Sequence, residues 1–266
     1  MNNTILKGVS ILRLLAENAD GLTITEICKN LNLPKSTVFD IVHTFENEKI
    51  LELSPQRPYA YRLGLEAFRI GYSFLSGATL DSVARPILEE LSQRINETVF
   101  MASRSGNHKV VYLMKFLSDS ELQTISAVGS VRHLLSVAMG KAILAALPQN
   151  EALAAVTEEM YATCSIPEIH DAPSLTAFLS EVRELGYVID RTAENSHLVS
   201  PVAAPVLDID GNVLGAVSIV AISDSKTPEQ IHALGKMIQE TALEISHRLG
   251  YNKDDLYAAA RRSVLS

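Results

Sequence analysis

One stretch, residues 23–63, constrains the fold of this chain more than any other: TITEICKNLNLPKSTVFDIVHTFENEKILELSPQRPYAYRL. Thr23 stands three residues before Glu26, which is the spacing of a capping box, and apolar residues then recur at helical intervals. Asn32 ends this short helix. Pro34 suits the first turn of a second helix, because the missing N–H of proline has no helical partner there. The pattern predicts two short helices joined by a tight turn.

The second of these helices is amphipathic. Its apolar side chains recur at positions i, i+3, i+4 and i+7, namely Val38, Ile41, Val42 and Phe45. Polar side chains share the opposite face, namely Lys35, Ser36, Thr37, Asp40 and His43. Two strands with a loop between them are expected at about 50–54 and 59–63, so the stretch predicts a winged helix-turn-helix. The alternative is a helical hairpin and a β-hairpin with a purely structural role.

The outward face of such a second helix is the part that enters the major groove of DNA. Its first turn offers hydroxyls and amides to phosphate, and a lysine there reaches phosphate or a guanine edge; the candidates are Lys35, Ser36, Thr37 and His43. Phe39 suits a thymine methyl or, alternatively, packs against the wing. Asp40 repels phosphate but can accept from a cytosine amine, unless it is turned away from DNA. Arg57 in the wing loop is expected at the minor groove or a phosphate, with a solvated loop residue as the alternative.

The distribution of charge qualifies this expectation. The chain has a formal net charge of −8, yet residues 1–75 contain eight Lys/Arg and eight Asp/Glu, so the excess of acid lies in the remainder. Neutralisation of phosphates drives non-specific DNA binding, and a neutral module therefore binds weakly by itself. We expect a homo-oligomer, a dimer or a tetramer, in which several modules raise the effective concentration at the DNA.

Length and composition set the broad class. With 266 residues, 47% apolar and 20% charged, the chain is expected to form one large or two modest globular domains with a real core. No apolar run approaches the roughly 18 residues that span a bilayer, and the N-terminus lacks the pattern of a secretory signal. Cys28 and Cys164 lie in different predicted domains, so we expect no disulfide and a location in the reducing cytoplasm.

Beyond the wing, helical and period-two patterns alternate. Residues 64–77 predict a linker helix, and the break at residues 76–78 places a domain boundary there. Asp210-Gly211 is a strong hairpin signal, and Ser136 is expected to cap a helix that ends at Pro148. Other helices are expected at about 80–95 and 227–249, and strands at 98–103, 109–116, 123–128, 201–207 and 212–222. These patterns predict an α+β domain with a mostly antiparallel sheet over residues 78–250, followed by a helical tail at 251–266.

Several motifs, in this order, cover the whole chain: the second-helix stretch LPKSTVFDIVHTFENEKIL, Gly140-Lys141-Ala142, Leu185-Gly186-Tyr187 and Val202-Ala203-Ala204-Pro205-Val206. In them the chain resembles the IclR family of bacterial transcriptional regulators. The resemblance implies two domains: a mainly α winged helix-turn-helix over residues 1–63, then, after the linker helix, a GAF-like α+β effector domain. It also implies dimers or tetramers whose effectors are small organic acids or aromatic metabolites.

An effector site is expected in the second domain. The free amides at the start of the Ser136 helix form an anion site, which points to Ser136 and Ala138. Met101 and Met139 are further candidates for the lining, with core filling as the alternative for each methionine. The resemblance adds Asp190 and Ser218; the alternative for this pair is a capping aspartate and a solvent-facing strand serine. Two positions depart from the family. Pro201 replaces a cysteine found in many relatives and Val220 a serine found in some, so we expect a less polar pocket.

The sequence contains no pattern of an enzyme. Its seven histidines do not fall at metal-ligand spacing, and no nucleophile elbow, P-loop or dinucleotide-binding glycine motif is present. We therefore expect no catalytic residues, no metal and no cofactor. The expected function is a DNA-binding transcriptional regulator, with repression favoured, whose binding to a double-stranded operator is modulated by a small organic acid or hydroxylated metabolite. No membrane partner is expected. The alternative is a winged-helix adaptor that binds protein instead of DNA.

Overall fold

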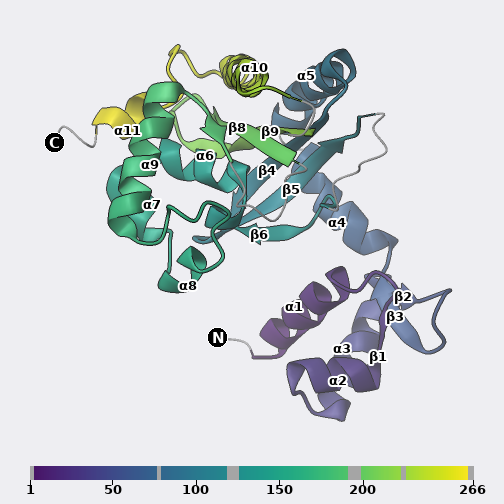
Figure 1. Cartoon of the computed structure of the whole chain (residues 1–266). Coiled ribbons are helices and arrows are strands. Elements are labelled where there is room, and N and C mark those ends of the chain that lie inside the picture. Colours follow the sequence, from purple (N-terminus) through teal and green to yellow (C-terminus); the bar gives the residue numbers. More distant parts are fainter. Residues whose placement is uncertain (1–2, 77–78, 119–125, 191–198, 223–225, 263–266) are drawn as a thin grey trace. The chain divides into compact units, whose positions relative to one another are not determined.

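The computed structural model describes residues 3–76, 79–118, 126–190, 199–222 and 226–262 (Figure 1). It divides into two compact units, Met1–Ala78 and Thr79–Ser266. None of the helices in the described ranges has the length and apolar character needed to cross a membrane.

The first unit is a winged helix-turn-helix, as the sequence predicts. Its helices are α1 (Asn3–Ala16), α2 (Ile24–Leu31), α3 (Lys35–Asn47) and α4 (Leu65–Ser76). Its strands are β1 (Leu22–Thr23), β2 (Leu51–Leu53) and β3 (Ala60–Leu63), which form an antiparallel sheet in the order β1-β3-β2. The two wing strands are present in the expected places. Strand β1 was not predicted, because two residues are too few to display an alternating pattern.

Capping residues define the turn between α2 and α3. The Thr23 hydroxyl accepts from the Glu26 amide, and the Glu26 carboxylate accepts from the Thr23 amide, so the predicted capping box is confirmed. Asn32 ends α2 in the left-handed conformation with φ of 49°, which asparagine tolerates better than most residues. Pro34 is the N-cap of α3, one residue before the position the sequence suggests.

The core of the first unit is built from α1, α2, α3 and the wing. Ile11 and Leu15 of α1 pack with Ile27 and Val38, all essentially inaccessible to solvent. A second apolar stripe on α1, through Ile5 and Val9, does not meet this core: Ile5 is 63% exposed and Val9 38%. Two apolar stripes run side by side on this helix, and periodicity alone does not decide which one meets the core.

The second unit is an α+β domain built on a six-stranded antiparallel sheet, as expected. Its strands are β4 (Thr98–Ser105), β5 (Lys109–Phe116), β6 (Val131–His133), β7 (Val188–Ile189), β8 (Val199–Leu207) and β9 (Val213–Ile222), in the order β6-β5-β4-β9-β8-β7. Its helices are α5 (Thr79–Ile95), α6 (Ala138–Ala146), α7 (Gln149–Ala154), α8 (Glu158–Tyr161), α9 (Ala172–Leu185), α10 (Pro228–Arg248) and α11 (Ala258–Arg262), and a 3₁₀ turn lies at Leu134–Ser136. Helices α5 and α10 cover one face of the sheet, and α6 with α9 covers the other (Figure 1).

Helix α6 is the central element of this unit. All nine of its residues are buried, which explains why its sequence, AMGKAILAA, is almost entirely small and apolar. Gly140 permits the close approach of the preceding 3₁₀ turn, since a side chain at this position would collide with the backbone of Leu134. The helix therefore begins at a fixed place against β8 and β9.

Three further predictions concern the second unit: a hairpin, a helix cap and a strand. The hairpin at Asp210-Gly211 is confirmed: it joins β8 to β9, and Gly211 takes φ of 85°. The Ser136 cap is wrong, because Val137 is the N-cap of α6 and the Ser136 hydroxyl donates to the carbonyl of His133 at 2.9 Å. Of the strand expected at 123–128, residues 123–125 lie outside the described residues and residues 126–128 are not a strand.

Candidate functional site

The outward face of α3 carries the predicted DNA-binding residues of the helix. At about 100° per residue, Ser36, Asp40 and His43 fall on the line opposite the buried Val38 and Ile41. Lys35 and Phe39 are exposed at one flank of this line, and Thr37 is half-buried beside it. Asp40 is therefore on the outward face, and its side chain is exposed.

Phe39 and His43 form a small aromatic group on this face. Phe39 is 47% exposed, and its ring lies 4.2 Å from the ring of His43 at an angle of 64°. The imidazole Nδ1 of His43 lies 2.9 Å from a carboxylate oxygen of Glu46, so that glutamate orients the ring. The partner of Phe39 is thus a residue of its own helix, one turn further along.

Arg57 does not project freely from the wing. Its Nη1 donates to the carbonyl of Gly21 at 2.6 Å and its Nη2 to the carboxylate of Glu26 at 2.8 Å. A hydrogen bond from the Thr23 amide, reinforced by the bond from Arg57, lowers the pKa of Glu26 to about 2. In this structure Arg57 fastens the wing loop to the start of α2. The aromatic side chain of the loop, that of Tyr59, is 86% exposed, and the sequence patterns do not single it out.

Ion pairs engage much of the positive charge of the first unit. Besides Arg57, Arg62 pairs with Glu52 and Arg69 pairs with Glu66, each through nitrogen–oxygen distances of 2.6 Å. These three arginines are thus compensated locally. The charge available to phosphate on α3 is mainly that of Lys35, at the positive end of the helix dipole.

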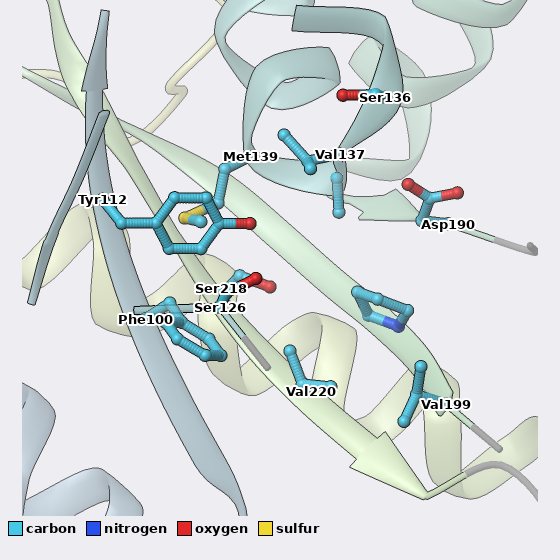
Figure 2. A pocket seen from close by; sticks show the side chains of 12 residues that line it. Phe100, Tyr112, Ser126, Ser136, Val137, Met139, Asp190, Val199, Ser218 and Val220 are labelled. Carbon is cyan, nitrogen blue, oxygen red and sulfur yellow. The ribbon is translucent and has the colours of Figure 1, made fainter. Parts of the chain in front are cut away.

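The second unit contains a cavity of about 170 Å³ between the start of α6 and the sheet (Figure 2). Its lining comprises Phe100, Tyr112, Ser126, Ser136, Val137, Ala138, Met139, Asp190, Val199, Pro201, Ser218 and Val220. The register of the sheet explains the gathering, because Phe100 and Ala203 lie on either side of Ser218, and Pro201 lies beside Val220. Residues that pair across antiparallel strands point to the same face.

Five of the six predicted effector residues line this cavity: Ser136, Ala138, Met139, Asp190 and Ser218. Met101 does not. It follows Phe100 on β4, and successive side chains of a strand point to opposite faces, so Met101 is buried on the other side of the sheet. Pro201 and Val220, the two positions at which a less polar pocket is expected, both line the cavity and make that wall apolar.

Asp190 is held by a buried polar cluster behind the cavity wall. It is 2% exposed and follows directly after β7, where its amide donates to the carbonyl of Pro201 at 2.8 Å. Its carboxylate accepts from Nζ of Lys141 at 2.8 Å and from the hydroxyl of Ser165 at 2.9 Å. The sequence does not reveal this cluster, because its three members are far apart in the chain.

Tyr112 and Ser126 form the opposite side of the cavity (Figure 2). Burial raises the pKa of Tyr112, and a hydrogen bond with Ser126 opposes the shift. The Phe100 ring meets the Tyr112 ring edge-on at 5.3 Å, which fixes the direction of the phenol. Tyr112 is not among the predicted site residues. Its sequence signal is weak, because it consists only of a tyrosine within the otherwise mostly apolar strand β5.

The described residues also bear on the question of a metal site. No group of three or more His, Cys, Asp or Glu in these ranges is placed to hold a metal ion. Both cysteines, Cys28 and Cys164, are free thiols. The two units thus combine an exposed helix face suited to a groove with a cavity suited to a small molecule.

Comparison with known proteins identifies this combination. The family model "IclR helix-turn-helix domain" matches residues 4–55, and "Bacterial transcriptional regulator IclR C-terminal" matches residues 72–247. The chain is 30% identical to the HTH-type transcriptional repressor AllR of Klebsiella pneumoniae over 244 residues. This alignment covers 92% of the chain and 89% of the relative.

Solved structures agree with the family models. IclR of Thermotoga maritima superimposes with a TM-score of 0.71 at 26% identity, covering 94% of this chain and all of that one. An IclR homologue of Microbacterium hydrocarbonoxydans, solved in complex with 4-hydroxybenzoate, has the same fold with a TM-score of 0.75 at 22% identity, covering 93% and 99%. These relatives are regulators of transcription and not enzymes. The chain belongs to the IclR family of bacterial transcriptional regulators.

Proposed function

We propose that the chain is a cytoplasmic repressor that binds its operator through α3 and the wing and responds to a small hydroxylated acid in the cavity of the second unit. The observation that carries the proposal is the coexistence of an outward polar face on α3 with a cavity that gathers Asp190 and Ser218. The assignment of repression rests on its relatives of the AllR group, which are named repressors.

In the proposed DNA complex, the first turn of α3 meets the backbone and the middle of the helix meets base edges. Lys35, Ser36 and Thr37 supply the charge, hydroxyls and amides for phosphate. Phe39, Asp40 and His43 lie one turn deeper, where a carboxylate can accept from cytosine and an aromatic edge can contact a thymine methyl. Arg57 contributes indirectly, by holding the wing loop against α2.

The proposed assembly is a dimer or tetramer. One chain presents one α3 and reads one half-site, and a dimer reads two half-sites spaced by whole helical turns. The balanced charge of residues 1–75 supports this, since a neutral module gains little from phosphates by itself. Light scattering of the full chain at micromolar concentration is expected to show no monomer as the main species.

Replacement of Lys35 tests the DNA face. Lys35→Ala is expected to weaken operator binding and to lower the slope of log K against log salt by about one unit per chain, because one phosphate contact is lost. Lys236→Ala, which removes an exposed lysine from α10 in the second unit, is the matched control. Mobility shifts over a range of salt concentrations measure both. An unchanged slope in the Lys35 variant would contradict the assignment.

A thermal-shift screen tests the cavity. Ligands that bind only the folded chain raise its unfolding temperature in proportion to RT ln(1 + [L]/Kd). We expect small hydroxylated acids, of the class that includes the 4-hydroxybenzoate bound to one relative, to give shifts that Ser218→Ala reduces. The absence of any shift across such a collection would count against an effector site in this cavity.

A further inference from the structure

Lys141 is a buried cation within an otherwise apolar helix. Its side chain is 0% exposed, and every other residue of α6 is small or apolar. Burial of a charge is costly unless it is paired and hydrogen-bonded, and an apolar side chain of similar length would pack here without that cost. Packing therefore does not account for a lysine at this position.

Lys141 joins three elements that meet behind the cavity. Its ammonium lies 2.8 Å from Oδ2 of Asp190, which follows β7, and donates to the hydroxyl of Ser165, between α8 and α9. Ser165 in turn donates to the same carboxylate, with distances of 2.9 and 3.0 Å to its two oxygens. The carboxylate is held from two directions, and its rotation about the side-chain bonds is blocked.

Only one member of the cluster lines the cavity. Asp190 lines the cavity, whereas Lys141 and Ser165 do not, and Figure 2 shows the Asp190 carboxylate at the edge of the open space. An ionised carboxylate offers about four acceptor positions, and the single proton of Ser165 with one from Lys141 occupies two of them. A ligand thus meets an acceptor with spare capacity whose negative charge is already balanced from behind.

No lysine, arginine or histidine belongs to the described lining of the cavity, so the balance of charge at this wall rests on Lys141. An ammonium entering such a site loses its hydration and meets a carboxylate that is already paired. A neutral hydroxyl has less hydration to lose and gains a hydrogen bond to an ionised acceptor, which is stronger than one between neutral groups.

We propose that Lys141 and Ser165 are positioning residues that orient Asp190 and balance its charge, so that this wall selects a ligand hydroxyl over a ligand ammonium. The inference deepens the proposed effector site and rests on it. Asp190 makes the contact, and the two residues behind it act through Asp190.

Three probes with one carbon skeleton test the selection: lactate, alanine and propionate. They share a carboxylate and differ only in the hydroxyl, ammonium or hydrogen on the second carbon, so all other contributions cancel in the ratios of their dissociation constants. Each probe is titrated with the full chain, and ligand-observed NMR monitors the binding. Lactate is expected to bind about tenfold more tightly than propionate, and more tightly than alanine.

Each substitution behind the wall should affect a different ratio of dissociation constants. Lys141→Met keeps the length of the side chain but leaves Asp190 unbalanced, so alanine is expected to gain about tenfold relative to lactate. Lys141→Arg keeps the charge and is expected to keep the order of the parent chain. Ser165→Ala releases one oxygen of the carboxylate, and the preference for lactate over propionate is expected to fall about threefold.

Ser246→Ala is the matched control, because it removes the same hydroxyl from a buried serine that lies on α10 and does not line the cavity. It should lower stability without changing any ratio. If Lys141→Met does not fold, the ratios of dissociation constants measured for Ser165→Ala and Lys141→Arg are compared with those of Ser246→Ala, and this comparison tests the inference.

Equal binding of lactate and propionate by the parent chain, or parent ratios in the Lys141→Met and Ser165→Ala variants, would overturn the inference. Binding of none of the three probes would overturn it as well. The metabolite screen judges the proposed function independently, so the two can fail separately.

Discussion

At the scale of single residues, the buried cluster of Lys141, Ser165 and Asp190 is the main discovery of the structure. Its members stand 24 and 49 positions from the lysine along the chain, and only the fold brings them together. A buried ion pair contributes little net stability over an apolar replacement, but breaking one partner leaves an uncompensated charge. The cluster therefore points to a requirement for Asp190 at the cavity and not to a need for stability.

The first prediction concerns the stability of this pair. Lys141→Met is expected to lower the free energy of unfolding of the second unit by about 3–5 kcal/mol, because Asp190 remains buried without its partner. The double variant Lys141→Met with Asp190→Leu should recover most of the loss. Urea unfolding followed by circular dichroism measures both. If Lys141→Met is as stable as the parent chain, the loss of Lys141 does not leave Asp190 as an uncompensated buried charge, and the prediction is wrong.

A second residue-scale prediction concerns Glu26. Its pKa falls from 4.5 to about 2 in the folded chain, through bonds from the Thr23 amide and from Arg57. A lowered pKa favours folding at pH values above 4.5, and this contribution is lost as the pH falls from 4.5 towards 2. Glu26→Gln should flatten the pH dependence of unfolding of the first unit over that interval. The exposed Glu48→Gln provides the comparison, and an equal pH dependence in both variants would contradict the assignment.

At the scale of elements, the capping box and the hairpin signal predicted the structure well, whereas the cap expected at Ser136 did not form. The capping box at Thr23 and the turn at Asp210-Gly211 both formed, and each rests on residues close in sequence. Predictions that needed tertiary information fared worse. The choice between two apolar stripes on α1, the side of the sheet occupied by Met101 and the tie between Arg57 and Glu26 depend on neighbours that local patterns do not contain.

Two glycines in helices give a matched test at this scale. Gly140→Ala places a methyl group against the backbone of Leu134, and we expect a loss of about 1–3 kcal/mol or more because α6 must shift. For Gly71→Ala in α4, no described atom beyond its own stretch of helix lies within 4 Å of the new methyl group, so a gain of about 0.5–1 kcal/mol is expected from helix propensity alone. Thermal unfolding of the two variants compares them. Equal effects would mean that α6 tolerates displacement.

At the scale of the whole molecule, a regulator needs its two sites to influence each other. If a ligand in the cavity changes operator affinity by some factor, operator DNA must change the affinity for that ligand by the same factor, typically about 5–150-fold. Measurement of ligand affinity with and without DNA is therefore as informative as measurement of DNA affinity with and without ligand. Unequal factors would indicate that a third process, such as a change of oligomeric state, takes part.

The central claim is that the outward face of α3 reads DNA sequence. The most direct measurement is selection of genomic fragments by the full chain, compared with a variant that carries Lys35→Ala, Ser36→Ala and His43→Ala together. These side chains are at least partly exposed, so the variant should fold. We predict that the parent chain enriches a small set of fragments with inverted repeats and that the variant enriches none. Equal enrichment by both chains, or no enrichment by the parent, would contradict the account.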